Sequence, residues 1–301
     1  MTLLPHTRRA LLPLGTLGLS LLVLSLAMGA PAGDDHARLD RPVMLDSNGP
    51  GSQLFVLDAS GSVHKLRLAE DKLEEYGKFS LPAEFTAADM TYASLDGQDS
   101  LLIAGTESDR GAVVRYSLDG QPLRTWRFRN ICSGIDYGAT SHLAYVATSD
   151  SNEIYRLDLR GTSSEYVTRI PYATKLGPVA FDEARQEIYV ADVASGKVYQ
   201  FVIAAKASKV LITDLSAPTA LAFDSEAGRL LIADPGRRAI LSVDTRSSNP
   251  VATEFASDPL KAPYGMTLLS KGQVAVADYG ANRVLVFSST KGLLFQYPQI
   301  P

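Results

Sequence analysis

The chain has 301 residues, of which 46% are hydrophobic and 21% charged, which excludes a disordered, collagen-like or coiled-coil protein. The formal net charge of −4 gives no reason to expect nucleic acid as a partner. A single cysteine, Cys132, excludes an internal disulfide, and the four histidines leave little material for a histidine-based metal centre.

Residues 1–32 have the layout of an export signal. Arg8 and Arg9 end a short basic start, an apolar run extends from Ala10 to Ala30, and small residues around Ala30 suit a signal peptidase. The apolar run is long enough to span a bilayer, so an uncleaved anchor is the alternative, and the paired arginines leave a twin-arginine export route open. Both versions place the rest of the chain outside the cytoplasm. We therefore expect a periplasmic or secreted protein, with a polar leader at 33–39.

The most informative feature is internal repetition. Six short apolar runs, rich in β-branched and aromatic residues, are closed by turn-forming residues and recur with a period of about 44 residues. They are Leu54–Asp58, Leu101–Gly105, Ala144–Thr148, Ile188–Asp192, Leu230–Asp234 and Val274–Asp278. Each run reads as a buried strand.

Three further strands accompany each run. A second apolar segment follows after a turn rich in Gly, Ser, Asn and Asp, which predicts a hairpin; an outer strand comes next, and another strand precedes the run. Four antiparallel strands repeated six times predict an all-β fold, a six-bladed β-propeller over residues 40–298, with inner strands beginning near residues 42, 89, 134, 178, 220 and 265. Closing the ring buries both faces of each sheet, which a lone blade cannot do.

The last copy resembles an NHL repeat. It contains Val276-Ala277-Asp278, then Asn282-Arg283-Val284 and Phe287, and Gly292 before the outer strand. The fourth and fifth copies keep the apolar-Ala-Asp ending, and the other copies are degenerate. This resemblance covers about residues 40–298 and implies the six-bladed fold. It says little about function, because the fold is shared by binding proteins and enzymes.

Propellers of the related gluconolactonase-like superfamily hold a divalent cation with carboxylate and asparagine side chains at the start of several inner strands. A hard cation needs several such oxygens. The matching positions in this sequence are read as Arg41, Ala88, Ser133, Gly177, Thr219 and Tyr264. None is acidic, so we expect no metal there, although Asp40, Asp89 and Asp136 lie close enough in sequence to offer a shifted site.

Other enzyme signatures are missing from the sequence. Amidating-lyase propellers use histidines on zinc, which needs about three protein ligands. After residue 32 the chain has only His36, His64 and His142, which are read as surface residues. No Gly-x-Ser-x-Gly motif is present, and no Gly-rich phosphate loop precedes a helix.

Several recurring or isolated polar residues are candidates for a role. Asp58, Asp192, Asp234 and Asp278 end their runs at one repeated position, which predicts a structural role in the following turn. Asp136 differs, because it stands where other copies are read as Met44, Thr91, Ala180, Ala222 and Thr267. Asp89, Asp136 and the inner-strand residue Tyr264 are therefore predicted ligand-binding residues.

The turns between second and third strands should open on the same face as the starts of the inner strands. Copies two and three contribute Glu107, Asp109, Asp150 and Glu153 there, offset only by Arg110, whereas copies four to six contribute Lys197, Arg237, Arg238 and Arg283. The aspartates at the bases of the latter turns cancel that charge unless they point into the turns. In that second case Arg237, Arg238 and Arg283 are free to recruit an anionic partner in forked pairs.

The sequence thus favours an exported, non-catalytic propeller, without a cofactor, that binds a protein, peptide or glycan through its loop face. A metal-dependent hydrolase or lactonase with an atypical site is the alternative, and a structural subunit of a cell-envelope complex is a third possibility. The identity of the ligand and the oligomeric state cannot be read from the sequence.

Overall fold

The structure is a computed structural model that describes residues 39–49, 52–69 and 72–298. The predicted export signal and all of the predicted leader except Leu39 lie outside the described residues. Over the described ranges no helix is both long and apolar enough to cross a membrane.

The described residues form six sheets of four antiparallel strands, which we number as blades 1 to 6. Blades 1 and 2 contain β1 (Pro42–Ser47), β2 (Gln53–Asp58), β3 (Ser62–Ala69), β4 (Lys72–Ser80), β5 (Phe85–Leu95), β6 (Gln98–Glu107), β7 (Arg110–Ser117) and β8 (Pro122–Arg127). Blades 3 and 4 contain β9 (Cys132–Gly138), β10 (Leu143–Thr148), β11 (Glu153–Asp158), β12 (Ser164–Arg169), β13 (Leu176–Asp182), β14 (Glu187–Asp192), β15 (Lys197–Val202) and β16 (Ala207–Ile212). Blades 5 and 6 contain β17 (Ala220–Asp224), β18 (Arg229–Asp234), β19 (Ala239–Asp244), β20 (Ala252–Ala256), β21 (Pro263–Leu268), β22 (Val274–Asp278), β23 (Arg283–Phe287) and β24 (Leu293–Tyr297), with 3-10 turns η1 (Ser270–Gly272) and η2 (Tyr279–Ala281).

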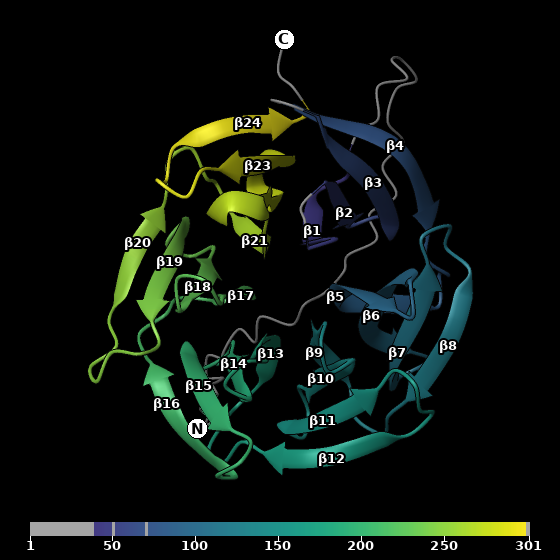
Figure 1. The fold of residues 1–301 in the computed structure, drawn as a ribbon, viewed down its shortest axis with the longest axis vertical. Helices are drawn as coiled ribbons and strands as arrows, with labels where there is room; N and C mark the ends of the chain where they lie inside the picture. Colours follow the sequence, from purple (N-terminus) through teal and green to yellow (C-terminus); the bar gives the residue numbers. More distant parts are fainter. Residues whose placement is uncertain (1–38, 50–51, 70–71, 299–301) are drawn as a thin grey trace, which may run out of the picture. The chain divides into compact units, whose positions relative to one another are not determined.

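The six blades are arranged in a ring, which confirms the predicted six-bladed propeller. The first strand of each blade lies innermost and the fourth lies on the outer wall (Figure 1). Strand order follows chain order in every sheet, so no blade borrows a strand from the far end of the chain. The observed inner strands begin at residues 42, 85, 132, 176, 220 and 263.

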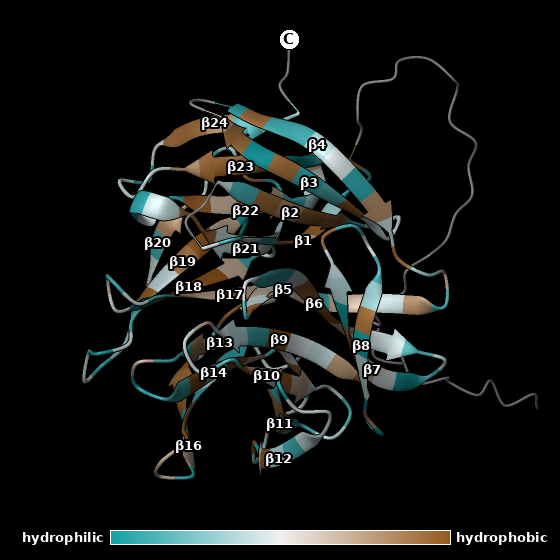
Figure 2. Cartoon of the chain, turned by 45° about the vertical axis from the view of Figure 1, so that its right-hand side comes forward, coloured by the Kyte–Doolittle hydropathy of each residue, from teal (hydrophilic) through white to brown (hydrophobic). Residues whose placement is uncertain are grey.

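The core consists of separate apolar clusters, one between each pair of neighbouring blades. The second strands supply most of it, and β10, β14 and β18 are buried on both faces over all but their first residue. This explains why the six runs are continuously apolar rather than alternating. Figure 2 shows hydrophobic residues along β2 and β23 and more hydrophilic residues on the outer strand β4.

Ring closure between blades 6 and 1 depends on side chains, because no strand is shared. Leu39 and Leu45 pack against residues of β22 and β23 in one cluster. The Ser47 hydroxyl donates to the Leu268 carbonyl at 2.9 Å, and the Thr267 hydroxyl donates to Asp46 at 2.7 Å. The contacts across this junction therefore hold the two ends of the described chain together.

Candidate functional site

One face of the ring collects the features that the sequence predicts to bind a partner. The inner strand pairs antiparallel with the second strand, so Pro42 lies opposite Asp58 in blade 1 and Pro263 lies opposite Asp278 in blade 6. The starts of the inner strands and the turns between second and third strands thus lie at one end of the blades, as predicted. We call this end the front face and the opposite end the back face.

Four buried aspartates on the front face have the structural role predicted for them. They are Asp58, Asp192, Asp234 and Asp278, none more than 3% exposed. The Asp192 carboxylate accepts the backbone N–H groups of Thr174 and Lys175, at 2.7 and 3.0 Å. It also accepts the N–H of Ser195 in the following turn, at 3.2 Å. Asp58 likewise accepts N–H groups from its turn and from Asp40. Asp234 and Asp278 bind the backbone leading into the inner strand and one arginine each, Arg237 and Arg283.

Three other aspartates, Asp46, Asp89 and Asp136, lie half-buried on the inner strands β1, β5 and β9. Each carboxylate accepts the N–H of the next residue in its own strand and one N–H from the inner strand of the following blade. The donors are Ser47 and Tyr92 for Asp46 (2.8 and 2.6 Å), Met90 and Ile135 for Asp89 (2.9 Å each), and Tyr137 and Phe181 for Asp136 (2.8 and 2.7 Å). An inner strand has a partner on one side only, so these carboxylates satisfy N–H groups that its open edge would leave free.

The register corrects the sequence alignment of the first copy. Asp136 lies opposite Tyr145, and Asp46 lies opposite Phe55, the equivalent residue of its run, so Asp46 and not Met44 matches Asp136. Asp136 is therefore not unique in its layer. The ring of bulged residues that contains Tyr264 likewise includes Val43 rather than Arg41, because β1 has its bulge between Pro42 and Met44.

The three inner carboxyls have perturbed acidity. Burial raises the pKa of both Asp89 and Asp136 to about 7, although their backbone N–H donors act in the opposite direction. Burial also raises the pKa of Asp46. Repulsion among the three carboxylates adds to the rise for Asp89 and Asp136. Such groups can exchange a proton near neutral pH.

A metal site requires several ligand side chains grouped around one point. Across the residues that the structure describes, no three His, Cys, Asp or Glu side chains are grouped so that they could hold a metal ion. Asp40, a candidate for a shifted site, is 56% exposed and pairs with Arg41 at 3.3 Å.

Tyr264 belongs to an aromatic cluster on the front face where blade 6 meets blade 1. Its ring contacts that of Tyr279, with 5.1 Å between centroids. The Arg41 guanidinium lies over the Tyr279 ring at 5.6 Å and donates to its hydroxyl at 3.2 Å. Both tyrosines are half-buried and Arg41 is exposed, so this cluster presents aromatic and guanidinium groups together. Such a combination is common in binding surfaces.

The three predicted anion-binding arginines are not equivalent. Arg283 is 14% exposed and donates to Asp278, Gln296 and the Pro259 carbonyl, at 3.4, 3.0 and 2.8 Å. Arg237 lies 3.5 Å from Asp234 and donates to a backbone carbonyl. The carboxylates at the turn bases thus engage both guanidinium groups, whereas Arg238 is exposed.

The front face of blades 2 and 3 carries more positive charge than predicted. Arg110, Arg127 and Arg129 surround an open pocket of about 430 Å³ with Phe128 in its wall. The expectation that Arg110 alone offsets the acids of these blades is wrong, because Arg127 pairs with Glu107 at 2.8 Å. Two of the other acids of this region accept hydrogen bonds: Asp150 from the Ile131 N–H, and Glu153 from Asn130, Ser151 and Tyr155.

Two large exposed side chains lie on the front face of blades 3 and 4. Ile131, which precedes β9, is 39% exposed, and Tyr172, which precedes β13, is 97% exposed. Tyr172 also has a φ of 64°, a left-handed conformation that is unfavourable for a residue with a side chain. A fully exposed aromatic ring on such a backbone contributes nothing to packing within the described ring, so it is available for a partner.

His64 is not a surface residue, contrary to the prediction. It is 2% exposed and lies between two carboxylates, with Nε2 3.0 Å from Asp58 and Nδ1 3.0 Å from Glu75. Glu75 in turn accepts the Tyr297 hydroxyl at 2.7 Å, which connects β4 to β24 across the ring closure. Burial lowers the pKa of His64, but the hydrogen bonds to Asp58 and Glu75 outweigh it and raise the pKa above its ordinary value. This network is therefore structural.

The sequence matches no protein-family model and no curated protein. Solved structures match the fold. The chain is similar to a structure described as a nidogen/laminin complex, with a TM-score of 0.66 and 16% identity over 81% of this chain and 92% of that one. It is also similar to a streptogramin B lyase (TM-score 0.61, 12% identity, 88% and 85% coverage) and to virginiamycin B lyase from Staphylococcus aureus (0.60, 14%, 88% and 88%). At these identities the likeness concerns the propeller fold alone.

Proposed function

We propose that the protein is an exported, non-catalytic propeller that binds another protein through the front face of blades 2 to 4. The partner presents acidic side chains to Arg110 and Arg129 and an apolar surface to Ile131 and Tyr172. An acidic peptide segment of such a partner fits this surface better than a neutral glycan does, because guanidinium groups recognise carboxylates in forked pairs.

The observation that carries this proposal is Tyr172, whose ring is 97% exposed on a left-handed backbone. Tyrosine and arginine are the residue types that most often dominate binding energy at protein interfaces. The front face places this tyrosine on the same side of the ring as the arginine pocket of blade 2. The net charge of −4 disfavours a long polyanion, while a short acidic segment is influenced mainly by charges within about 10 Å.

The comparisons support this choice only through the fold, which the chain shares with a protein solved in a nidogen/laminin complex. Export is proposed from the predicted signal at residues 1–32. A role as a structural subunit of an envelope complex would be one form of the same protein-binding function.

The test is capture from the extracytoplasmic fraction of the source cell with immobilised wild-type protein and two double variants. The front-face variant is Arg110→Ala with Arg129→Ala, and the matched control on the back face is Arg160→Ala with Arg246→Ala, both exposed. A protein that binds the wild type and the control but not the front-face variant supports the proposal. Equal capture of a protein by all three baits, or capture of no protein by any of them, would contradict the proposed function.

The alternative function is a metal-dependent hydrolase or lactonase. Its support is the set of inner-strand carboxyls, two of which have a pKa of about 7, together with a fold shared with streptogramin lyases. Every one of these carboxyls already binds backbone N–H groups, which argues for a structural role. Stoichiometric divalent metal in the purified protein, with a lactonase activity that is lost on chelation and in Asp136→Ala, would establish the alternative.

A further inference from the structure

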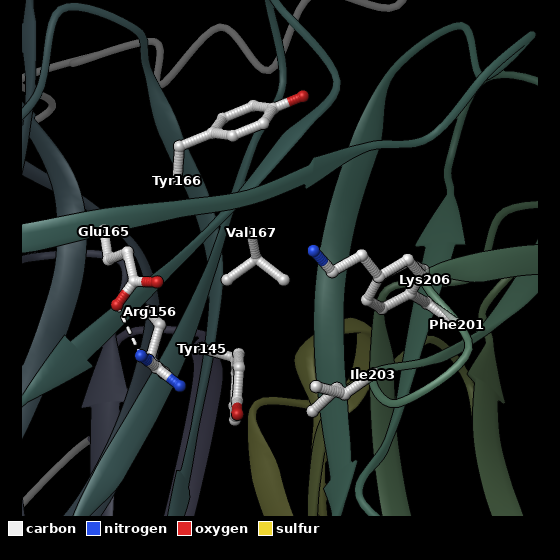
Figure 3. Close-up of a pocket in the computed structure, with 8 residues that line it drawn as sticks. All are labelled: Tyr145, Arg156, Glu165, Tyr166, Val167, Phe201, Ile203 and Lys206. Carbon is white, nitrogen blue, oxygen red and sulfur yellow. Dashed lines mark hydrogen bonds and ion pairs between the residues drawn. The ribbon is translucent and has the colours of Figure 1, made fainter.

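A second pocket lies on the outer wall of the ring, between blades 3 and 4 and away from the front face. It has a volume of about 210 Å³ and is lined by side chains of β10, β11, β12 and β15 and by the turn that follows β15. Figure 3 shows Val167 in the middle of the pocket, with Phe201 and Ile203 on one side and Tyr145 below. The floor is therefore apolar.

At each of the two preceding blade junctions, a cation of one blade donates to a backbone carbonyl of the next. Between blades 1 and 2, the Lys65 ammonium donates to the Leu118 carbonyl at 3.0 Å. Between blades 2 and 3, the Arg124 guanidinium donates to the Leu159 carbonyl at 3.2 Å. Leu118 and Leu159 each follow the third strand of their blade, and the equivalent residue of blade 4 is Ile203.

At the junction of blades 3 and 4, Arg156 corresponds to Lys65, and Glu165 stands where blade 2 has Arg124. Arg156 lies opposite Tyr145 in the register, as Lys65 lies opposite Phe55. Its guanidinium pairs with Glu165 of its own blade (Figure 3), and the Ile203 carbonyl accepts the backbone N–H of Lys206 at 3.2 Å. Among the described residues, neither charged residue at this junction is therefore shown to cross to blade 4 as Lys65 and Arg124 cross at the two junctions before it.

The rim of the pocket carries one cation without a partner in the described part of the chain. The Lys206 ammonium points toward Val167 and the centre of the pocket (Figure 3). Glu165, the only carboxylate in the lining, is neutralised by Arg156. Tyr166, which is 54% exposed, lies above Val167, and Tyr145, which lies below it, is 1% exposed (Figure 3). The net field at the pocket is positive.

We propose that this lateral pocket binds a small organic acid that carries one apolar ring. The ring packs on Val167 and Ile203, and the carboxylate pairs with Lys206. The volume is suitable, because a cavity of about 150 Å³ is enough to hold benzene. The charge selects an acid over an amine of the same shape, since an ammonium group would face Lys206. This site does not depend on the proposed front-face function, because it is formed by other residues.

The test titrates the full-length protein with phenylacetate, benzyl alcohol and benzylamine and follows methyl resonances of Val167 and Ile203 by NMR. Phenylacetate should bind saturably, benzyl alcohol at least tenfold more weakly, and benzylamine not at all. Lys206→Met keeps the aliphatic stem and should weaken phenylacetate binding at least tenfold without changing that of benzyl alcohol. The control Lys209→Met, an exposed lysine of β16, should change neither.

A second variant guards against an indirect effect of the charge change. Val167→Phe fills the pocket from its centre and should abolish binding of both phenylacetate and benzyl alcohol while the protein stays folded. The proposal is wrong if phenylacetate does not bind saturably, if Lys206→Met leaves its affinity unchanged, or if benzylamine binds as well as the acid. Retained binding of phenylacetate in a folded Val167→Phe protein would also overturn it.

Discussion

Replacing His64 by glutamine should destabilise the protein by an amount that depends on pH. Both ring nitrogens of His64 lie 3.0 Å from carboxylate oxygens, which only accept hydrogen bonds, so only the doubly protonated imidazolium can donate to both. Glutamine can donate to one carboxylate through its amide and leaves the other without this partner. Breaking a buried ion pair costs about 3 kcal/mol, so the variant should lose roughly that much near pH 6.

The cost should shrink as the pH rises. The pKa of His64 is raised above its ordinary 6.5, so the stability that the imidazolium contributes is fully present below pH 6.5 and is lost as the pH rises through the folded-state pKa. At pH 9 the neutral ring donates to one carboxylate only, as glutamine does, and the difference should fall to about 1 kcal/mol. Burial raises the pKa of Asp58, but its hydrogen bonds outweigh burial and lower the pKa. The stability that Asp58 contributes is therefore constant between pH 6 and pH 9 and does not alter the comparison.

The assay is urea unfolding of the wild type and the variant at pH 6 and pH 9, with thermal unfolding as a check. A loss of about 3 kcal/mol corresponds to a fall of roughly 6 to 12 °C in Tm for a domain of this size. Tyr172→Phe, on a fully exposed ring, serves as a control and should change nothing. A difference between wild type and His64→Gln that is the same at both pH values would refute the reasoning.

Further substitutions should destabilise the protein at structural residues and have little effect at exposed ones. Because the pKa of Asp136 is raised from 3.8 to about 7, wild-type stability contributed by this group falls as the pH rises between those values, and Asp136→Asn should flatten that fall in urea unfolding at pH 5 and 8. Arg283→Ala leaves the 0% exposed Asp278 without its cation and should cost about 2–3 kcal/mol in denaturant unfolding, whereas Arg238→Ala should stay within about 0.5 kcal/mol. Gly134→Ala would place a Cβ 2.1 Å from the Gly177 carbonyl oxygen of the next blade and should prevent folding or lower Tm sharply, while Gly161→Ala, with a nearest contact of 3.5 Å, should be tolerated; a stable Gly134→Ala protein would contradict the close approach of the inner strands.

The fold could be predicted from the sequence because its main signal is local. Each second strand is buried on both faces, so it is a continuous apolar run that can be recognised in the sequence without knowledge of the rest of the chain. The turn aspartates could be predicted for the same reason, since Asp192 binds backbone within its own turn. The register of the first copy could not be predicted, because the separation between the bulged residue and the opposing run differs between copies: it runs from Val43 to Phe55 in blade 1 and from Ala88 to Leu102 in blade 2.

The parts of the site that were missed depend on contacts between distant residues. The Tyr297 hydroxyl meets Glu75 across a separation of 222 residues, and nothing in the alternating pattern of β3 marks His64 as buried. Arg127 ends the outer strand β8 and Arg129 follows it. Both share a pocket with Arg110 at the start of β7, which only the antiparallel pairing of β7 and β8 brings close. A linear count of turn charges therefore underestimates the positive charge of blade 2.

The front face of blades 2 to 4 is proposed to bind a protein through its exposed arginines. The most direct measurement is the association rate of the captured partner, at low and high ionic strength, with the wild type and with the Arg110→Ala, Arg129→Ala variant. Rim charges act mainly on association, so the variant should associate more slowly at low salt and approach the wild type at high salt. Equal association rates at both ionic strengths would contradict the claim.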